Sequence, residues 1–168
     1  IRVPALEDYA WRLWDYWERH LDPDLSIDRS LRGAVKGKVV MITGGSSGIG
    51  EAAAIRIAEA GGKVIVVARD EEKLAEVRKK ITDAGGFVKT YSCDITEYAA
   101  NDKLAKDVLK EFGHVDVLIN NAGRSIRRSL ALSYDRFHDF ERTMQLNYFA
   151  CVRLTMNLLP SMTARKDG

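Results

Sequence analysis

From residue 38 onward, apolar and polar positions alternate in blocks that predict a regular series of strands and helices. Short Val- and Ile-rich runs predict strands at 38–43, 63–68, 87–93 and 115–120. Between and after them, apolar residues recur every three or four positions, which predicts helices at 47–60, 70–84, 97–112 and 136–159. Pairs of glycines end the first two helices, and Pro160 is expected to end the last one.

The alternation of strands and helices predicts the fold class. A helix-length crossover returns the chain to the same end of the sheet, so successive strands are parallel, and right-handed crossovers place helices on both faces. Val and Ile are nearly continuous at 39–42 and 64–67, as expected for strands covered on both faces. We therefore expect an α/β fold, a doubly wound (Rossmann) parallel sheet truncated after the fourth strand and its following helix.

The first 36 residues have a different pattern. Apolar positions predict a helix over 5–20. Three tryptophans lie on one face of this helix, and the charged residues between them are mixed in sign, whereas a membrane-surface helix is rich in Lys and Arg. We therefore expect the tryptophan face to pack on protein. Residues 21–37 are rich in turn and capping residues and predict a linker. We expect an N-terminal helix and linker over 1–36 and a nucleotide-binding domain over 37–168. Because the chain starts with Ile1, we expect a fragment of a longer protein.

Composition narrows the function classes. The chain has 168 residues, 46% of them hydrophobic, which fits one domain with a filled core. Its 26 basic and 24 acidic residues nearly cancel, which disfavours nucleic-acid partners. Cys93 and Cys151 have no spacing typical of a disulfide framework or zinc site, and the three histidines have no metal-ligand spacing, so no metal is expected. No run is long enough to span a membrane, and we expect a cytoplasmic protein.

The stretch TGGSSGIG (43–50) lies between the first strand and the first helix. The start of a helix presents unpaired N–H groups and the positive end of its dipole, so an anion is expected there. Gly44 suits a tight turn, Gly48 allows close approach of a pyrophosphate, and Gly50 allows close packing of the helix. Ser46 and Ser47 add hydroxyl donors. A merely tight connection is the alternative, but the place of the glycines after a strand and before a helix favours phosphate binding.

Three motifs in order, TGGSSGIG, CDIT (93–96) and NNAG (120–123), resemble the short-chain dehydrogenase/reductases over about residues 36–160. The resemblance implies that Asp94 lies beside the adenine and that Asn147 is the helix asparagine of the catalytic tetrad. Taken without the other two motifs, Asn120 and Asn121 would be better interpreted as turn residues that end a strand. The remaining cofactor-site residues that it implies are Ile49, Ile95, Asn120, Ala122 and Gly123.

The end of the second strand bears on the choice of cofactor. An Asp or Glu there would bind the free ribose 2′-hydroxyl of NAD, but this chain has Ala68, followed by Arg69. A guanidinium binds a phosphate bidentately, so the sequence favours NADPH, with Ser46 assisting. The alternative is that Arg69 is an ordinary surface residue.

A narrower resemblance lies in residues 120–149, which are similar to bacterial fatty acyl-CoA reductases. Residues 14–25 resemble the segment that precedes the reductase domain in the multidomain members of that group. It implies NADPH-dependent reduction of fatty acyl-CoA or fatty aldehyde, an upstream domain and a possible homo-oligomer. It also suggests that three arginines of one loop meet phosphates of coenzyme A or of a carrier-protein arm, although a solvated charged loop explains them equally well. These are Arg124, Arg127 and Arg128.

Carbonyl reduction needs a proton donor beside the developing oxyanion and a cation that lowers its pKa. The family supplies a Tyr, a Lys four residues later and a Ser, but no Tyr of this chain is followed by Lys at that spacing. We expect the parent protein to be an oxidoreductase and this chain to bind cofactor without turnover, with its fourth strand as an exposed apolar edge. The alternatives are a ketoacyl or other carbonyl reductase of the same family and a non-catalytic dinucleotide-binding segment.

Overall fold

A computed structural model describes residues 30–165. The helix predicted at 5–20 lies outside the described residues. Apart from residues 31–34, which fall in the unit Ile1–Ala34, the fold below belongs to the compact unit Val35–Gly168. Its strands are β1 (Val39–Thr43), β2 (Lys63–Ala68), β3 (Phe87–Ser92) and β4 (Val117–Asn120). The helices are α2 (Leu31–Val35), α3 (Gly48–Glu59), α4 (Glu71–Asp83), α5 (Tyr98–Phe112), α6 (Phe137–Met144) and α7 (Cys151–Arg165), with a short 3-10 turn at Leu130–Leu132 and a π-helical segment at Gln145–Ala150.

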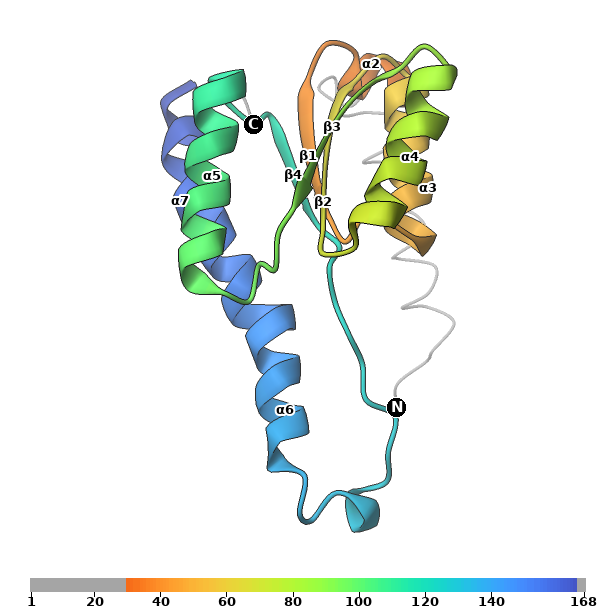
Figure 1. The fold of residues 1–168 in the computed structure, drawn as a ribbon. Coiled ribbons are helices and arrows are strands. Elements are labelled where there is room, and N and C mark those ends of the chain that lie inside the picture. The colour runs from red at the N-terminus through yellow and green to blue at the C-terminus, as the bar shows by residue number, and fades with distance from the viewer. Residues whose placement is uncertain (1–29, 166–168) are drawn as a thin grey trace, which may run out of the picture. The chain divides into compact units, whose positions relative to one another are not determined.

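The four strands form one parallel sheet in the order β3-β2-β1-β4. The strand order reverses between β1 and β4, and the carboxyl ends of these strands meet at one edge of the sheet. Helices α3 and α4 cover one face, and α5 and α7 cover the other (Figure 1). This confirms the predicted doubly wound fold and places its switch point beside the glycine-rich turn.

Alternate residues of the central strands fill two separate cores. Val40 and Ile42 of β1 pack with α3 and α4, whereas Val39 and Met41 pack with α5 and α7. All four are at most 3% exposed, because each face of the sheet is covered by helices. The double burial explains why β1 is apolar without interruption and holds its carboxyl end rigidly in place.

The structure corrects three predictions about the helices. The predicted linker at 21–37 contains the one-turn helix α2. The helix predicted over 136–159 is helical throughout from Phe137, but it is interrupted by a π-helical segment at Gln145–Ala150, in which one extra residue is inserted into the turn. Pro160 does not end the helix, since α7 continues to Arg165.

Tertiary contacts explain why α7 continues past its proline. A proline removes one backbone hydrogen bond and disfavours a helix by about 3 kcal/mol. Beyond it, Met162 packs against the core under α5, and the guanidinium Nη2 of Arg165 lies 3.1 Å from Oδ1 of the buried Asp116. These contacts stabilise a turn that the local sequence disfavours.

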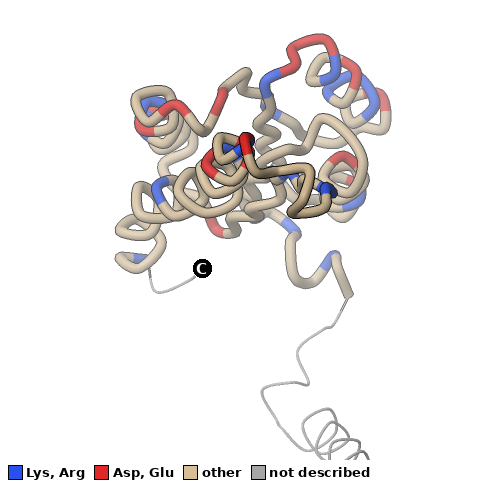
Figure 2. Tube along the Cα trace, turned by 90° about the horizontal axis from the view of Figure 1, so that it is seen from below, with Lys and Arg blue, Asp and Glu red and all other residues tan. Residues whose placement is uncertain are grey.

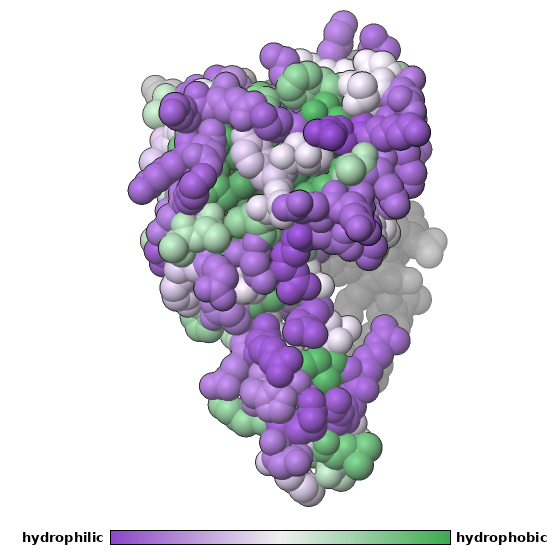
Figure 3. Space-filling model, viewed as in Figure 1, coloured by the Kyte–Doolittle hydropathy of each residue, from purple (hydrophilic) through white to green (hydrophobic). Residues whose placement is uncertain are grey.

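Strand β4 is the edge of the sheet on its side, as predicted, and its residues are half-buried or exposed. The segment after it carries many exposed apolar side chains, part of which appears green in the lower part of Figure 3. They include Leu130, Leu132, Phe137, Phe140, Met144, Tyr148, Val152, Met156 and Leu159. Basic and acidic residues are interspersed along the described helices (Figure 2). Within residues 30–165, no helix combines the length and apolar character needed to cross a bilayer.

Candidate functional site

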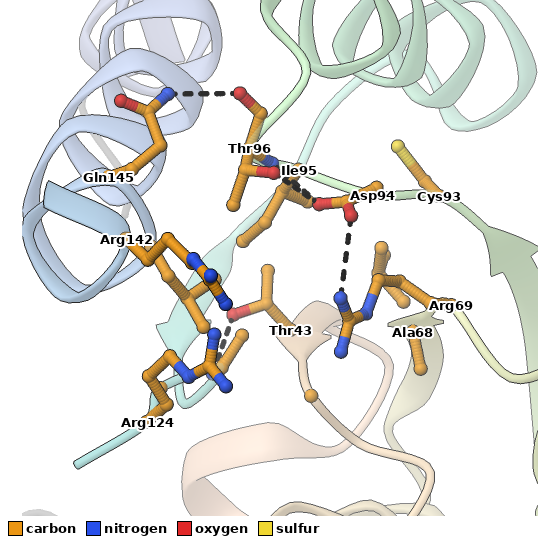
Figure 4. Close-up of a pocket in the computed structure, with 15 residues that line it drawn as sticks. Thr43, Ala68, Arg69, Cys93, Asp94, Ile95, Thr96, Arg124, Arg142 and Gln145 are labelled. Carbon is orange, nitrogen blue, oxygen red and sulfur yellow. Dashed lines mark hydrogen bonds and ion pairs between the residues drawn. The ribbon is translucent and has the colours of Figure 1, made fainter. Parts of the chain in front are cut away.

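A cavity of about 430 Å³ opens at the carboxyl ends of the strands, where the switch point of the sheet lies (Figure 4). Such crevices are where open α/β sheets bind ligands. Each of the four strands or the turn after it contributes to the walls, and so do α6 and the π-helical segment. The lining residues are Thr43, Gly44, Val67, Ala68, Arg69, Cys93, Asp94, Ile95, Thr96, Ala122, Gly123, Arg124, Arg142, Gln145 and Leu146.

The glycines of the turn after β1 differ in what surrounds them. Gly44 has φ +66°, and a Cβ there would lie 2.8 Å from the Cα of Ala122, so the turn and the segment after β4 touch backbone to backbone. A Cβ on Gly50 would lie 2.5 Å from the carbonyl oxygen of Gly44, so α3 begins in close contact with the turn. Gly48 has φ +59° and open space at its Cβ position. The backbone at Gly48 is therefore accessible to a ligand.

Asn121 and Thr43 tie the turn to the segment after β4. The amide Nδ2 of Asn121 donates to the carbonyl oxygens of Thr43 and Gly44, both at 3.0 Å. The hydroxyl oxygen of Thr43, which is fully buried, accepts from the backbone N–H groups of Asn121 at 3.2 Å and Ala122 at 3.1 Å. Sequence reasoning missed both roles, because the partners are separated by 77 to 79 residues along the chain.

At the end of β2, Arg69 faces Asp94 across the cavity wall (Figure 4). Its Nη1 lies 3.5 Å from Oδ2 of Asp94, but the Arg69 side chain is 76% exposed, so the contact is a weak surface pair and the guanidinium stays available. Burial raises the pKa of Asp94, but the hydrogen bonds from Thr96 and the charge of Arg69 outweigh it. The net pKa therefore lies below the usual range, which keeps Asp94 charged.

Arg69 also lines a second cavity with Ser46, Ser47, Asp70 and Lys73. Asp70 is the N-cap of α4, where Oδ1 accepts from the backbone N–H of Lys73 at 3.1 Å. That hydrogen bond is the main cause of the lowered pKa of Asp70. The remaining polar groups are two hydroxyls and two cationic side chains, a donor set suited to a phosphate. Lys73 was not predicted, because it comes beside the serines only when β1 and β2 pair in parallel and the turns after them meet at one edge of the sheet.

Asn147 lies in the π-helical segment and holds the backbone after NNAG. Its Oδ1 accepts from the N–H of Arg124 at 2.9 Å, and its Nδ2 donates to the carbonyl oxygen of the same residue at 2.8 Å. A Cβ on Gly123 would lie 3.4 Å from that Oδ1. The side chain therefore fixes the position of Arg124 at the cavity wall. π-helical turns frequently occur at functional sites.

The fold, the three motifs and this crevice occur together within one region of the chain. The family model described as short chain dehydrogenase matches residues 38–168. This chain belongs to the short-chain dehydrogenase family. The family residues include the whole sheet and every residue that lines the two cavities.

Relatives and solved structures agree with this membership. A protein named fatty acyl-CoA reductase from Acinetobacter baylyi is 55% identical over 142 residues, which is 84% of this chain and 48% of that protein. A metagenomic short-chain oxidoreductase solved in complex with NADP matches with a TM-score of 0.75 at 34% identity, covering 80% of this chain and 61% of that chain. An NADH-dependent reductase complexed with NAD matches with a TM-score of 0.70 at 34% identity, covering 81% of this chain and 56% of that one. The chain thus spans about half the length of the relative, and the fold accommodates either dinucleotide.

The predicted site residues divide among three places in this family member. Gly44, Arg69, Asp94, Ile95, Ala122 and Gly123 line the main cavity. Ser46 and Ser47 line the second one. The others line neither: Gly48, Ile49, Gly50, Asn120 and Asn147. Of these, Ile49 is 84% exposed, and the Nδ2 of Asn120 donates to the hydroxyl of Thr155 at 3.2 Å.

The three arginines of the loop after NNAG have different surroundings. Arg124 lines the main cavity. Nη1 of Arg128 lies 2.7 Å from Oδ2 of Asp139, a carboxylate that Nε of Arg136 also contacts at 2.9 Å. These two guanidiniums, Arg136 foremost, lower the pKa of Asp139. Arg127 lines neither cavity. Of the three, only Arg124 has a place in the crevice.

Other residues of the main cavity also escaped prediction. Gln145 donates from Nε2 to the carbonyl oxygen of Thr96 at 3.0 Å and so joins the start of the π-helical segment to the turn after β3. Cys93 is half-buried, and burial raises the pKa of its thiol, so it is not an activated nucleophile. Arg142 enters from α6. The CDIT motif was the one signal for Cys93 and Thr96, whereas no local pattern indicated Arg142 or Gln145.

Proposed function

We propose that this chain forms the cofactor-binding part of an NADPH-dependent reductase of the short-chain dehydrogenase family. The observation that carries the proposal is the position of Arg69, which lines both cavities at the end of β2. There it stands where an acidic residue would select NAD. With Ser46, Ser47 and Lys73 it provides donors for a 2′-phosphate, while Asp70 is occupied by Lys73.

The described residues fit a dinucleotide. The open space at Gly48 and its positive φ leave the backbone at the start of α3 free for a diphosphate. Asp94 and Ile95 then face the adenine, and Asn120, Ala122 and Gly123 lead toward the nicotinamide end. Ile49 and Gly50 complete the turn. When bound, the cofactor supplies the hydride, and the role of this chain is to position it. The fit supports NADPH, because the charge of Arg69 and the neighbouring donors favour a 2′-phosphate, which NADH lacks.

Catalysis needs more than these residues provide. Asn147 is the family's helix asparagine and holds the backbone of Arg124. A Tyr followed by Lys at the fourth position does not occur in the 168 residues, so no proton donor of that kind accompanies it. We infer that the chain by itself binds NADPH without reducing a substrate. The substrate of the whole protein is proposed to be a fatty acyl-CoA or fatty aldehyde, which the 55% identical fatty acyl-CoA reductase supports.

The cofactor assignment is tested with Arg69→Ala. Removing a charge-assisted contact to the 2′-phosphate is expected to weaken NADPH binding by about tenfold or more and NADH binding by less than about threefold. Isothermal titration calorimetry measures both affinities. Arg78→Ala, which removes an exposed arginine of α4 outside both cavities, is the matched control. Equal losses for the two cofactors would refute the 2′-phosphate assignment.

A second measurement tests the activity. This chain and the full-length protein are compared for NADPH consumption with acyl-CoA, fatty aldehyde and ketoacyl substrates. Turnover only in the full-length protein, and only with the first two, supports the proposed function. A preference for ketoacyl substrates would point to another reductase of the family. NADPH binding with no turnover in either form would leave a non-catalytic binding module.

A further inference from the structure

A buried asparagine on α5 joins two elements that form walls of the main cavity. Asn101 is fully buried, and its Nδ2 donates to the carbonyl oxygen of Ile95 at 2.9 Å and to that of Ala150 at 3.1 Å. Ile95 lies in the turn after β3, and Ala150 is the last residue of the π-helical segment. A single side-chain amide therefore holds both elements from the core side of the cavity.

Gln145 makes a second tie between the same two elements, at the cavity wall itself. It is the first residue of the π-helical segment, and its Nε2 donates to the carbonyl oxygen of Thr96 at 3.0 Å (Figure 4). Thr96 in turn donates from its backbone N–H and its hydroxyl to Oδ1 of Asp94, at 3.0 Å and 2.7 Å. The π-helical segment is thus bound, at its first and last residues, to the turn that carries Asp94.

The chemistry of Asn101 indicates that its contribution is hydrogen bonding and not packing. Both of its partners are carbonyl oxygens, so only an N–H donor fits, and an apolar side chain would leave the two carbonyl groups without this donor. Its Oδ1 is buried and has no protein hydrogen-bond partner within residues 30–165. Burying that oxygen disfavours asparagine relative to an apolar residue of similar size, so the apolar core alone does not explain this side chain.

The middle of the π-helical segment carries the tie across the cavity. Asn147 lies between the two anchored ends, and its side chain binds the N–H and the carbonyl oxygen of Arg124 at 2.9 Å and 2.8 Å. Asp94 and Ile95 line the same cavity as Arg124 (Figure 4). A shift of the π-helical segment against the turn after β3 would therefore change the shape of the whole cavity.

We propose that Asn101 and Gln145 are positioning residues that fix the π-helical segment against the turn after β3. Through this segment they hold Asn147, and with it the backbone of Arg124, at the cavity. The inference rests on the proposed function, in which Asp94 faces the adenine and Asn147 is the family's helix asparagine. Because a preformed cavity needs little ordering when a ligand binds, the two ties raise the affinity for the cofactor.

Hydrogen exchange in the ligand-free chain tests the tie without any cofactor. NMR measures the exchange rate of the Arg124 backbone N–H, and the amides of β1 report global opening. Asn147→Ala, which removes the acceptor, is expected to raise this rate about tenfold, and Asn101→Leu about threefold. In the double variant the rate should equal that of Asn147→Ala, because both act through the same hydrogen bond. Additive effects would mean that Asn101 acts through general stability and would overturn the proposal.

Calorimetry with NADPH tests the consequence for binding. Asn101→Leu and Gln145→Met keep a similar size but lose the donor, and each is expected to weaken binding about threefold to tenfold. Gln145 is only half-buried, so its variant keeps the proposal testable if Asn101→Leu does not fold. Asn157→Leu is the matched control, because Nδ2 of Asn157 also joins α7 to α5, at 2.9 Å from Oδ1 of Asp102, but lines neither cavity. It should leave both the NADPH affinity and the exchange of Arg124 unchanged.

Contrary results distinguish this inference from the proposed function. If the wild type binds NADPH and neither Asn101→Leu nor Gln145→Met changes the affinity or the exchange rate, the positioning role is wrong and the proposed function stands. An equal loss in Asn157→Leu would assign the effect to the packing of α5 on α7 and would also overturn the inference. If the wild type binds no nicotinamide nucleotide, the proposed function fails, and the role in cofactor binding fails with it even where the exchange rates show the tie.

Discussion

Replacing Asn121 by Ala removes the side chain that holds the turn after β1. Its Nδ2 donates to the carbonyl oxygens of Thr43 and Gly44, both at 3.0 Å and both in a partly buried setting. Each neutral hydrogen bond contributes about 1 kcal/mol net, and a carbonyl left without a donor costs about 1 kcal/mol more when water is excluded. Because water reaches part of this site, we expect the free energy of unfolding to fall by about 2–3 kcal/mol.

The assay is urea unfolding followed by circular dichroism, with a thermal scan beside it. A loss of this size lowers the melting temperature by about 5–10 °C in a chain of this length. Asn120→Ala is the control, because its side chain makes one exposed hydrogen bond to Thr155, at 3.2 Å, and is expected to cost less than about 0.5–1 kcal/mol. If the two substitutions cost the same, or if Asn121→Ala costs less than about 0.5 kcal/mol, then the contact of Asn121 with the turn does not stabilise the fold as argued.

Two further predictions concern packing and pH. Gly50→Ala is expected to destabilise by about 2 kcal/mol, because its Cβ would lie 2.4 Å from Nδ2 of Asn121 and 2.5 Å from the Gly44 oxygen. Combined with Asn121→Ala it should cost less than the sum in urea unfolding, and additive losses would contradict the contact. Asp102 accepts from Nε and Nη2 of Arg153 at 2.7 Å and 2.6 Å, which is the main cause of its pKa of about 2 against an ordinary 3.8. Because this pKa is lowered in the folded state, the pair's stabilisation is complete above about pH 4 and is lost as the pH falls toward 2. Asp102→Asn should remove that part of the pH dependence of the urea midpoint, and an unchanged profile would argue against the pair.

The hydrophobic pattern was sufficient for the order of elements and the fold class. Strand β1 is apolar throughout because both faces of the sheet are covered, and that double burial leaves a continuous run in the sequence. The glycines of the turn were recognisable because Gly44 and Gly48 require positive φ, a constraint that acts within one or two residues. The family membership followed from motifs of the same short range.

Other features depended on contacts that no local pattern records. Pro160 is a helix-ending signal, yet α7 continues because Met162 and Arg165 find partners in the core and on Asp116. The return of α6 toward the cavity brings Arg142 beside the segment after β4, although a long loop separates them in the chain.

The sequence by itself therefore determined the strands, the doubly wound sheet and the position of the glycine-rich turn, because periodicity and glycine act over a few residues. Only the tertiary structure decided which side chains share the crevice. Asn121, Lys73 and Arg142 occupy their places because distant elements pack against one another, and the energy of those contacts depends on three-dimensional distance rather than on position in the chain.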